Sequence, residues 1–480
     1  MKRDNSLRQE QRKLMMVNEP VSKVICKMAI PTIVAFLINS VYSLADTYFV
    51  SGLGTNATAA VSVNASLDQL IMMCGSMLAV GANSYIARLL GQGDEKKASQ
   101  VLSTAFFLAA AIGTLLLVFG SIFITPMVRL LGATPTCEQY AVEYATYVLP
   151  VAPFMATSFV MNQCLRSEGS ATLSMIGMGF GGILNCVLDP IFIQGMPALG
   201  IPAMGVAGAS IATAISKVVS FAILIFPYMT RRSLLRLSLR NFRFCRDIVG
   251  EIVSVGSSSM FRSGLAVVAG ILLNDMAGNI SDSVLAGIGV STKIMMFPFS
   301  IILGFGTGFQ PVAGFNWGAK KYDRVRKSYS FSAVVALIGG VVMAVLLIVL
   351  ADPIIVAFAG DDPEMRRIGA LSIRLQCIAL PIHGWVAVVN MLCSGLGNAG
   401  GAFLLATARQ GSCMLPVLFP MAHFFGEYGI ASVQAVADVL SLALAIPISV
   451  HMMKKIKSAQ MEMETNEPVS PVQTTKDMIE

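Results

Sequence analysis

Charged side chains are scarce in this sequence. Asp, Glu, Lys and Arg make up only 13% of the 480 residues, whereas hydrophobic residues make up 55%. Soluble domains carry about 25% charged residues, so the composition argues against a soluble enzyme. It also excludes a disordered chain, because disordered segments are hydrophilic and highly charged.

Metal-binding and catalytic motifs are also absent. The sequence has only three histidines, and no two of its nine cysteines form a C-x-x-C pair, so neither a zinc site nor a disulfide framework is expected. It contains no G-x-x-x-x-G-K-[ST], G-x-S-x-G or H-E-x-x-H segment, the motifs of P-loop nucleotide binding, serine hydrolases and zinc proteases. We therefore expect a protein that is not an enzyme and that uses no metal and no cofactor.

Long apolar runs dominate the chain instead. A membrane-spanning helix needs roughly 20 mainly apolar residues, and helices are the only open-chain structures that satisfy every backbone group in lipid. The sequence therefore predicts an all-α integral membrane protein with twelve transmembrane helices. The predicted spans are 24–50, 57–82, 98–124, 138–163, 170–194, 205–228, 248–274, 284–310, 327–350, 366–392, 402–425 and 430–453.

Basic residues gather in alternate loops. Most of the 34 Lys and Arg residues fall in segments that twelve spans would place on one side of the membrane. Since positive residues mark cytoplasmic loops, the pattern predicts a multi-pass protein of the cell (inner) membrane with both termini in the cytoplasm. The net charge of +7 reflects this topology, and no nucleic-acid partner is expected. The basic segments are 1–27, 88–97, 231–246, 320–327 and 454–476, together with Arg166.

The two halves of the chain resemble each other at a nearly constant offset of 227 or 228 residues. A constant offset across several residue types indicates an internal repeat. Each half holds six of the predicted helices, so both halves enter the membrane in the same direction and form a parallel repeat. The matching pairs are Gly91 and Gly318, Pro135 and Pro363, Pro153 and Pro381, Asn162 and Asn390, Gly169 and Gly397, and Ala171 and Ala399.

The repeat divides the chain into two lobes, 24–228 with helices 1–6 and 248–453 with helices 7–12. Residues 1–23 and 454–480 are the predicted cytoplasmic tails, and 229–247 is the predicted cytoplasmic linker. The linker interleaves leucine and phenylalanine with arginine. It is either an ordinary positive-inside connection, which we favour, or a segment that lies on anionic lipid headgroups.

Two aspartates lie inside predicted spans of the N-terminal half. Asp46 is near the outer part of helix 1, and Asp189 is near the outer part of helix 5, with Asn185 one turn before it. An ionisable group in a membrane helix costs about 2.5–3.5 kcal/mol on insertion scales, so it is a candidate functional residue. A buried carboxylate can take up a proton or another cation and release it again. The structural alternative is that Asp189 and Pro190 end helix 5 and that Asp46 caps a helix at the interface.

Further ionisable residues fall inside predicted spans and are secondary candidates. Arg262 and Lys293, in helices 7 and 8, would form structural ion pairs, the alternative we favour, or would line a substrate path. Lys217 and Arg409 lie close enough to the inner face for their side chains to snorkel toward it. The acidic candidates are Asp68, Asp275 and Asp438.

Several local motifs are distinctive. They are Ile30-Pro31-Thr32 with Asp46-Thr47, Leu165-Arg166-Ser167-Glu168-Gly169, Leu184-Asn185 followed by Leu188-Asp189-Pro190-Ile191-Phe192, Gly205-Val206-Ala207-Gly208-Ala209-Ser210-Ile211-Ala212-Thr213, and Gln310-Pro311 with Asn316-Trp317-Gly318. Together they resemble the multidrug and toxic compound extrusion (MATE) family, and most closely its DinF- and MepA-like branch. The resemblance covers nearly all of residues 20–455.

The resemblance implies two six-helix lobes with a cleft between them, and antiport of drugs against protons or sodium ions. In DinF-like members a polar cluster of the N-terminal lobe carries the coupling. Matched onto this sequence, that cluster consists of Asp46, Tyr144, Asn162, Asn185, Asp189 and Thr213. The predicted spans place Asn162 near the inner end of helix 4, away from the aspartates, which conflicts with its membership.

The NorM-like branch of the same family instead uses an acidic residue in helix 7. Here that region reads Ser257-Ser258-Ser259-Met260-Phe261-Arg262, without an acid. A sodium site of that kind in the C-terminal lobe is therefore not expected, and coupling through the N-terminal lobe is favoured.

We therefore predict a secondary antiporter, acting as a monomer in the lipid bilayer. It exports drug-like small molecules, cationic or amphipathic, in exchange for H⁺ or Na⁺. The alternative from a related architecture is a flippase for lipid-linked oligosaccharides, which requires a cavity rich in arginine and lysine for a pyrophosphate. A channel or signalling protein would need neither the repeat nor the buried carboxylates.

Overall fold

The computed structural model describes residues 14–51, 53–196, 200–359 and 362–466. The outer parts of both predicted tails, 1–13 and 467–480, lie outside the described residues. Every described element is a helix, so the predicted all-α fold is confirmed. In chain order the elements are α2 (Val21–Ser51), α3 (Thr55–Gln92), α4 (Glu95–Ile122), α5 (Ile124–Leu130), α6 (Glu138–Val148), η1 (Leu149–Val151), α7 (Ala152–Ser167), α8 (Ala171–Gln194), α9 (Gly205–Met229), η3 (Leu239–Asn241), α10 (Arg246–Gly278), α11 (Asp282–Gly318), α12 (Tyr322–Ala359), α13 (Pro363–Gly395), α14 (Ala399–Thr407), η4 (Ala408–Ser412) and α15 (Met414–Asn466).

Among the described residues, eleven helical segments are long and apolar enough to cross a membrane. The last of them, Ala399–Thr465, has 67 residues and is broken at Gly426, whose φ of 54° and ψ of −128° are not helical. The break separates two crossings, so the chain has the twelve spans that the sequence predicts. The fourth predicted span is composite, because α6, η1 and α7 follow one another through Pro150 and Pro153.

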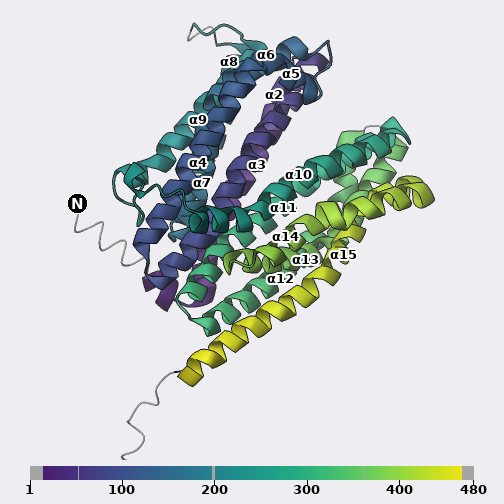
Figure 1. The fold of residues 1–480 in the computed structure, drawn as a ribbon. Helices are drawn as coiled ribbons and strands as arrows, with labels where there is room; N and C mark the ends of the chain where they lie inside the picture. Colours follow the sequence, from purple (N-terminus) through teal and green to yellow (C-terminus); the bar gives the residue numbers. More distant parts are fainter. Residues whose placement is uncertain (1–13, 52, 197–199, 360–361, 467–480) are drawn as a thin grey trace, which may run out of the picture.

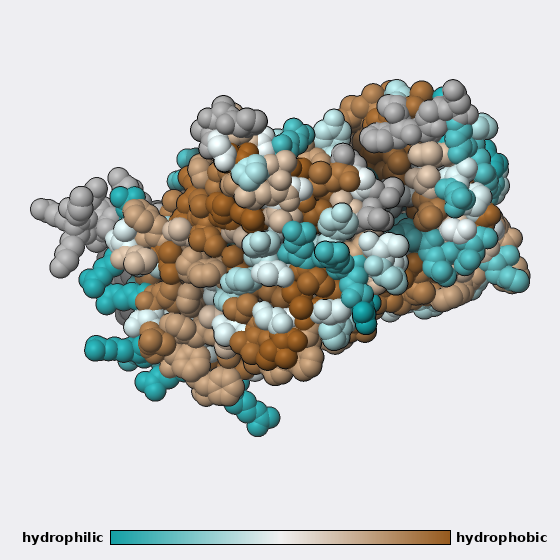
Figure 2. All heavy atoms as spheres, turned by 90° about the horizontal axis from the view of Figure 1, so that it is seen from above, coloured by the Kyte–Doolittle hydropathy of each residue, from teal (hydrophilic) through white to brown (hydrophobic). Residues whose placement is uncertain are grey.

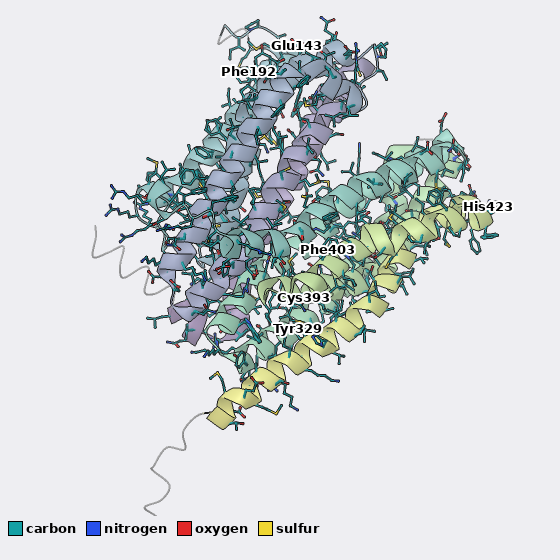
Figure 3. All side chains as sticks on the ribbon, viewed as in Figure 1. Glu143, Phe192, Tyr329, Cys393, Phe403 and His423 are labelled. Atoms are coloured by element: carbon teal, nitrogen blue, oxygen red, sulfur yellow. The ribbon has the colours of Figure 1, made fainter. Side chains whose placement is uncertain are left out.

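The helices form two lobes that diverge toward one end of the molecule (Figure 1). α2 to α9 make the first lobe, and α10 to α15, green to yellow, make the second. Glu143 and Phe192 mark the free end of the first lobe, and His423 marks that of the second (Figure 3). α15 ends on the opposite side, where the lobes meet.

Equivalent asparagines make the same hydrogen bond in both lobes. Asn162 Nδ2 donates to Ser174 O, and Asn390 Nδ2 donates to Ala402 O, each over 3.0 Å. In each lobe the bond links the fourth span to the fifth, and both the donors and the acceptors are 228 residues apart. The predicted internal repeat is therefore present in the structure.

Equivalent glycines also allow the same close helix contact. A Cβ atom on Gly113 would lie 2.5 Å from Pro153 Cα, and one on Gly340 would lie 2.6 Å from Pro381 Cα. Only a residue without a side chain permits such an approach between membrane helices. The two lobes thus share their internal packing as well as their order of helices.

Four glycines bring the lobes into backbone contact, and we call them the glycine seam: Gly81 and Gly91 in α3, Gly256 in α10 and Gly318 in α11. A Cβ atom on any of them would lie between 1.9 and 2.1 Å from a carbonyl oxygen of the opposite lobe. The facing residues, in that order, are Ile252, Phe315, Met77 and Arg88. The contacts of α3 with α11 are reciprocal, as expected for elements related by an axis between the lobes.

Polar contacts accompany the seam. Arg88 Nη2 lies 2.5 Å from Glu251 Oε1, which joins α3 to the start of α10. The Ser84 hydroxyl donates to the backbone oxygen of Ser394 in α13. These residues lie beside the basic segment 88–97, so the lobes meet on the side that the positive-inside pattern assigns to the cytoplasm.

The linker between the lobes is attached to the first lobe. The Glu168 carboxylate accepts hydrogen bonds from the Ser233 hydroxyl at 2.7 Å and from the Leu234 N–H at 2.8 Å. The Thr104 hydroxyl, on α4, accepts from the Arg243 N–H at 3.1 Å. The linker is therefore held against the first lobe at both of its ends.

Hydrophobic residues cover broad areas of the molecular surface (Figure 2). The lipid-facing side of α12 illustrates this, because its exposed apolar side chains recur along the helix. They include Val334, Ile338, Val341, Val342, Val345 and Val349. Exposed apolar surface of this extent is typical of a membrane-contacting face.

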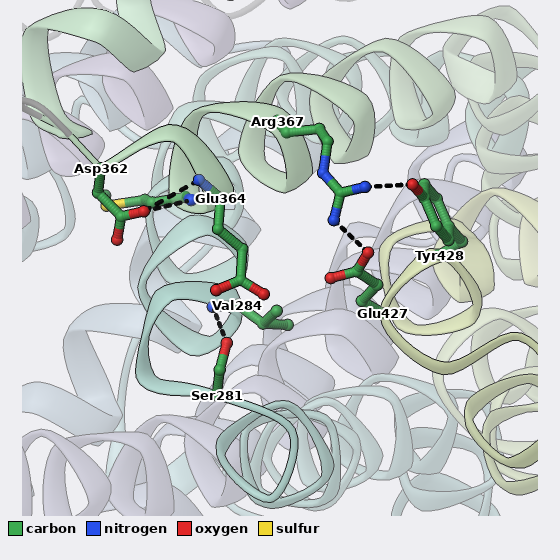
Figure 4. A network of polar contacts seen from close by, with 8 residues as sticks. Ser281, Val284, Asp362, Glu364, Arg367, Glu427 and Tyr428 are labelled. Carbon is green, nitrogen blue, oxygen red and sulfur yellow. Dashed lines mark hydrogen bonds and ion pairs between the residues drawn. The ribbon is translucent and has the colours of Figure 1, made fainter.

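Polar contacts join α11, α13 and α15 at the free end of the second lobe (Figure 4). The Ser283 hydroxyl, which donates to Asp362 Oδ2 at 2.6 Å, and backbone N–H groups in the first turn of α13 hold the pKa of the Asp362 carboxyl below its usual range. Arg367, one turn further along α13, binds Glu427 and Tyr428 just after the break in α15. The break is thereby fixed to α13.

Candidate functional site

Polar side chains from five helices come together inside the first lobe, and we call them the N-lobe cluster. Three of these helices each supply two members one turn apart, because residues i and i+4 share a helix face. The pairs are Tyr42 and Asp46 on α2, Asn185 and Asp189 on α8, and Thr213 and Lys217 on α9, and the cluster is completed by Asp68 on α3 and Tyr144 on α6.

Asp189 is fully buried and is bound by Asn185. With the Asn185 amide oriented to satisfy both of its ends, Nδ2 donates to Asp189 Oδ2 at 2.8 Å. Oδ1 then accepts from the Thr213 hydroxyl at 3.2 Å and from the Thr213 N–H at 3.1 Å. The amide therefore links the carboxylate on α8 to α9, so a change in the charge of Asp189 acts on both helices.

Asp46 and Asp68 share one positively charged neighbour, Lys217. Each aspartate has a buried Oδ1 atom without a hydrogen-bond partner among the described residues. The Lys217 ammonium lies 5.3 Å from the centroid of the Tyr42 ring, a cation–π distance. With Asp189, the cluster holds three carboxylates and one ammonium group. Buried carboxylates without a matching charge are costly, and they are stabilised by binding a proton or a metal cation.

Two tyrosines bring hydroxyl groups to the same place. Tyr42 and Tyr144 both approach Thr213, and both lie near Asp46 and Asp68. Hydroxyls, a side-chain amide and carboxylates are oxygen ligands of the kind that hard cations prefer, and they also form proton-carrying hydrogen-bond networks.

Asn162 makes its hydrogen bonds away from the N-lobe cluster, and its assignment to the coupling site stays a prediction. Its amide donates to Ser174 O at 3.0 Å and accepts from Arg166 Nη2 at 2.5 Å. Its counterpart Asn390 makes the same backbone bond in the second lobe. A bond that recurs in both lobes is structural, and the predicted position of Asn162 near the inner end of its span agrees with this role.

A pocket, here called the N-lobe pocket, is lined both by Asn162 and by the cluster members Tyr42, Asn185, Thr213 and Lys217. Its charged lining residues are Arg166 and Lys217. Arg166 is 1% exposed and donates to Ser174 Oγ at 2.9 Å. Neither residue is predicted as a site member, because in the sequence Arg166 resembles a loop cation and Lys217 a cation that snorkels. The available signal was spacing, since Lys217 follows Thr213 by one helical turn.

In the second lobe, Arg409 forms a buried ion pair, so the prediction that it snorkels is wrong. Its Nε donates to Asp438 Oδ1 at 2.7 Å, and its guanidinium lies 4.0 Å from the centroid of the Phe299 ring. His383 Nδ1 is 3.6 Å from the same carboxylate oxygen. Asp438 is 2% exposed and is thus matched by a neighbouring cation.

The remaining candidates form no ion pair with these groups among the described residues. Lys293 is exposed, and Asp275 is an exposed residue that accepts from Asn279 at 3.5 Å. Arg262 donates to Ser259 Oγ at 3.2 Å. Neither Arg262 nor Lys293 forms an ion pair within the described ranges, so the ion-pair interpretation of both is not supported. In that part of the chain, no three His, Cys, Asp or Glu residues are arranged to hold a metal ion.

Known proteins match this chain over most of its length. The multidrug export protein MepA of Staphylococcus saprophyticus is 27% identical over 438 residues, which cover 90% of this chain and 94% of MepA. MepA of Staphylococcus aureus is 26% identical over 437 residues, with coverage of 91% and 94%.

Solved structures agree with the fold. The crystal structure of a MATE protein in complex with MaL6 has a TM-score of 0.86 at 24% identity, covering 93% of this chain and 99% of that chain. A MOP superfamily transporter from Pyrococcus furiosus has a TM-score of 0.84 at 24% identity, covering 93% and 98%. These similarities show that the chain shares their two-lobed fold.

A family model described as MatE matches residues 31–191 and again residues 259–417. The two matches begin 228 residues apart, which is the offset of the internal repeat. Because the matches cover more than half of the chain, the protein belongs to the MatE family of membrane transporters, as the sequence motifs predict.

Proposed function

We propose that this protein is a secondary antiporter that exports organic, cationic or amphipathic compounds in exchange for H⁺ or Na⁺. The similarity to proteins named multidrug export protein supports export of organic compounds. The proposal includes a monomer in the cell (inner) membrane, with both termini in the cytoplasm. The observation that carries the coupling is the excess of carboxylates over ammonium groups in the N-lobe cluster.

The mechanism follows from the hydrogen bonds of Asp189. When Asp189 is ionised, the Asn185 amide donates to it and accepts from Thr213, which ties α8 to α9. When H⁺ or Na⁺ binds the Asp189 carboxylate, the carboxylate is no longer fully available as an acceptor for Asn185. The Asn185 amide must therefore change its hydrogen bonds. Asn185 and Thr213 line the N-lobe pocket, so the rearrangement changes its wall. An ion shifts the equilibrium between two arrangements of these helices only if it binds one arrangement more tightly than the other. The substrate competes with the ion because it favours the arrangement without a bound ion.

The test is transport of ethidium in proteoliposomes, with proton and sodium gradients imposed separately. Asp46→Asn and Asp189→Asn preserve side-chain size and remove the charge. We expect each to reduce gradient-driven transport, because it removes the coupling between ion and substrate binding, which typically changes affinity by roughly 5–150-fold. Asp275→Asn, which removes an exposed carboxylate of the second lobe, is the matched control and should transport as the wild type does.

The same assay separates the alternatives. Gradient-driven transport that survives both substitutions would overturn the N-lobe coupling site. A wild type that moves no organic compound but flips lipid-linked oligosaccharides would replace the antiporter with the flippase. The N-lobe pocket argues against a pyrophosphate site, because it is lined by only two cations. One of them, Arg166, is already bound by Asn162 and Ser174.

A further inference from the structure

A second pocket, the interlobe pocket, lies between the two lobes. Residues of α2, α3 and α7 line it from the first lobe, and residues of α10, α11 and α13 line it from the second. Its apolar walls include Phe36, Met72, Phe159, Leu303 and Met391. A pocket with such walls accepts the apolar part of an organic molecule.

Arg262 is the charged residue among those lining the interlobe pocket, and no Asp or Glu accompanies it there. A guanidinium carries five N–H donors. Arg262 Nη2 donates to Ser259 Oγ at 3.2 Å. Most of its donor capacity therefore remains available to a molecule in the pocket.

The surroundings of Arg262 do not neutralise it. The nearby His383 lies close to both Arg262 and Arg409. The carboxylate of that region, Asp438, is already paired with Arg409 at 2.7 Å. A cation within a membrane protein normally faces a counter-charge, and the described chain supplies none to Arg262.

The two pockets adjoin and share the same charge character. Phe36, Met72 and Phe159 line both of them. The charged residues of the N-lobe pocket are Arg166 and Lys217, again without a lining carboxylate. The aspartates of the N-lobe cluster do not line either pocket. The charged side chains that line this space directly are therefore cations, and among them Arg262 is the one that lies away from the aspartates of the N-lobe cluster.

Arg262 is also linked to the contact between the lobes. Ser259, its hydrogen-bond partner, donates to Ser76 Oγ at 3.4 Å. Ser76 belongs to α3, in the first lobe, and both serines line the interlobe pocket. A ligand that binds Arg262 thus contacts the point where α10 meets α3, and its affinity depends on how the lobes are arranged.

We propose that the interlobe pocket recognises amphipathic organic anions, and that Arg262 is the residue that selects them by binding a carboxylate, sulfonate or phosphate group. Arginine presents a planar fork of donors that matches such groups. This inference rests on the proposed function and narrows its substrates to amphipathic compounds with an anionic group. The apolar part of the ligand packs on Phe36, Met72 and Phe159.

The test uses two xanthene dyes of opposite charge, fluorescein and the ethyl ester of tetramethylrhodamine, with full-length protein in neutral detergent. Fluorescence anisotropy measures the affinity for each dye. We expect Arg262→Gln to weaken fluorescein binding about tenfold or more, because a charge-assisted hydrogen bond is lost. Arg262→Lys should restore part of the affinity. Lys293→Gln removes an exposed cation outside both pockets and should bind fluorescein as the wild type does.

Binding of the cationic dye is the internal control for folding. Arg262→Gln should bind it unchanged or more tightly, since a repulsive charge is removed. Wild type that prefers the cationic dye, or Arg262→Gln that binds fluorescein with wild-type affinity, would overturn the proposal. If Arg262→Gln lost affinity for both dyes equally and Arg262→Lys did not restore it, the proposal would also be overturned, because that pattern indicates structural damage.

Two further arms identify the source of the anion and separate this inference from the proposed function. Displacement of fluorescein by a naphthalene sulfonate supports a soluble compound, whereas displacement by short-chain phosphatidylglycerol alone supports a lipid headgroup. In proteoliposomes, gradient-driven transport of the cationic dye alone overturns anion selection while the antiporter stands. Arg262-dependent binding without gradient-driven transport of either dye overturns the antiporter while anion recognition stands.

Discussion

Asn162 and Asn390 show how the repeat distinguishes roles at single positions. Both make a 3.0 Å bond to a backbone oxygen, and only one of them lies in the lobe that holds the N-lobe cluster. A residue needed for coupling has no reason to recur with the same partner in the second lobe. The family motif led to Asn162 as a coupling residue because motif matching records position and residue type, not the partner.

Replacement of either asparagine by alanine tests this assignment. Asn390→Ala leaves a buried backbone oxygen without its donor and should lower the free energy of unfolding by about 1–3 kcal/mol. Asn162→Ala should cost more, because Arg166 also loses an acceptor. Thermal unfolding in detergent measures both. Thr114→Ala, which removes an exposed bond within α4, is the control and should change the stability by less than about 0.5 kcal/mol. An unchanged melting temperature for Asn390→Ala would refute the structural role.

Five of the eight members of the N-lobe cluster were predicted from the sequence, three of them from local spacing and two, Tyr144 and Thr213, from the family resemblance. Asp46 and the pair Asn185 and Asp189 are polar residues in apolar spans, which spacing alone reveals. The sequence makes Asp68 only a secondary candidate for a functional residue, and it predicts that the Lys217 side chain snorkels toward the inner face. Their role depends on the packing of α3 and α9 against α2, which no pattern within one helix encodes.

The helices extend further than their apolar segments. α3 has 38 residues and α12 has 38, whereas the predicted spans end where hydropathy falls. Hydropathy identifies the part of a helix that lies in hydrocarbon, and it does not identify the helical turns that continue beyond the hydrocarbon. The glycine seam includes such a continuation, since Gly91 lies beyond the predicted end of its span. The lobe contacts were therefore not predictable, although the repeat that arranges them was.

A methyl group in the glycine seam should force the lobes apart. In Gly256→Ala the new Cβ would lie 1.9 Å from Met77 O, which is backbone and cannot rotate away. We expect a cost of roughly 1–3 kcal/mol to the arrangement in which α3 and α10 touch, as for overpacked interiors. Limited proteolysis of the segment 88–97 measures the opening.

Gly270→Ala, about four turns further along the same helix, is the matched control. Its Cβ would meet no atom within 4 Å, and loss of a helical glycine alone stabilises by about 0.5–1 kcal/mol. Equal proteolysis rates for Gly256→Ala and the wild type would show that the seam does not hold the lobes together.

The whole molecule is closed at one end and divergent at the other, and charge contributes to the closed end. Arg88 and Glu251 form an ion pair across the lobes, at 2.5 Å, with side-chain exposures of 16% and 33%. A partly exposed pair of this kind contributes about 1 kcal/mol or less. Its loss therefore shifts the balance between two arrangements of the lobes by a few fold, without unfolding either.

Glu251→Gln should lower the population in which the ends marked by Glu143 and His423 lie apart. Distances between spin labels at these two positions, in a cysteine-free background, measure the population (Figure 3). The double variant Arg88→Glu with Glu251→Arg restores the opposite charges and should restore the wild-type distances. Identical distances in Glu251→Gln and the wild type would exclude a role for the pair in holding the lobes.

The linker is fixed to the first lobe, which leaves one short join between the two lobes. Because Ser233, Leu234 and Arg243 are bound to the first lobe, the connection travels with that lobe, and the pivot is the short join between Arg243 and the first turn of α10. α10 has 33 residues, which at a rise of about 1.5 Å each span about 50 Å. A tilt of about 10° at this join would displace the far end of such a rod by roughly 9 Å, so a small rotation of the second lobe would change the separation of the two free ends by a large amount.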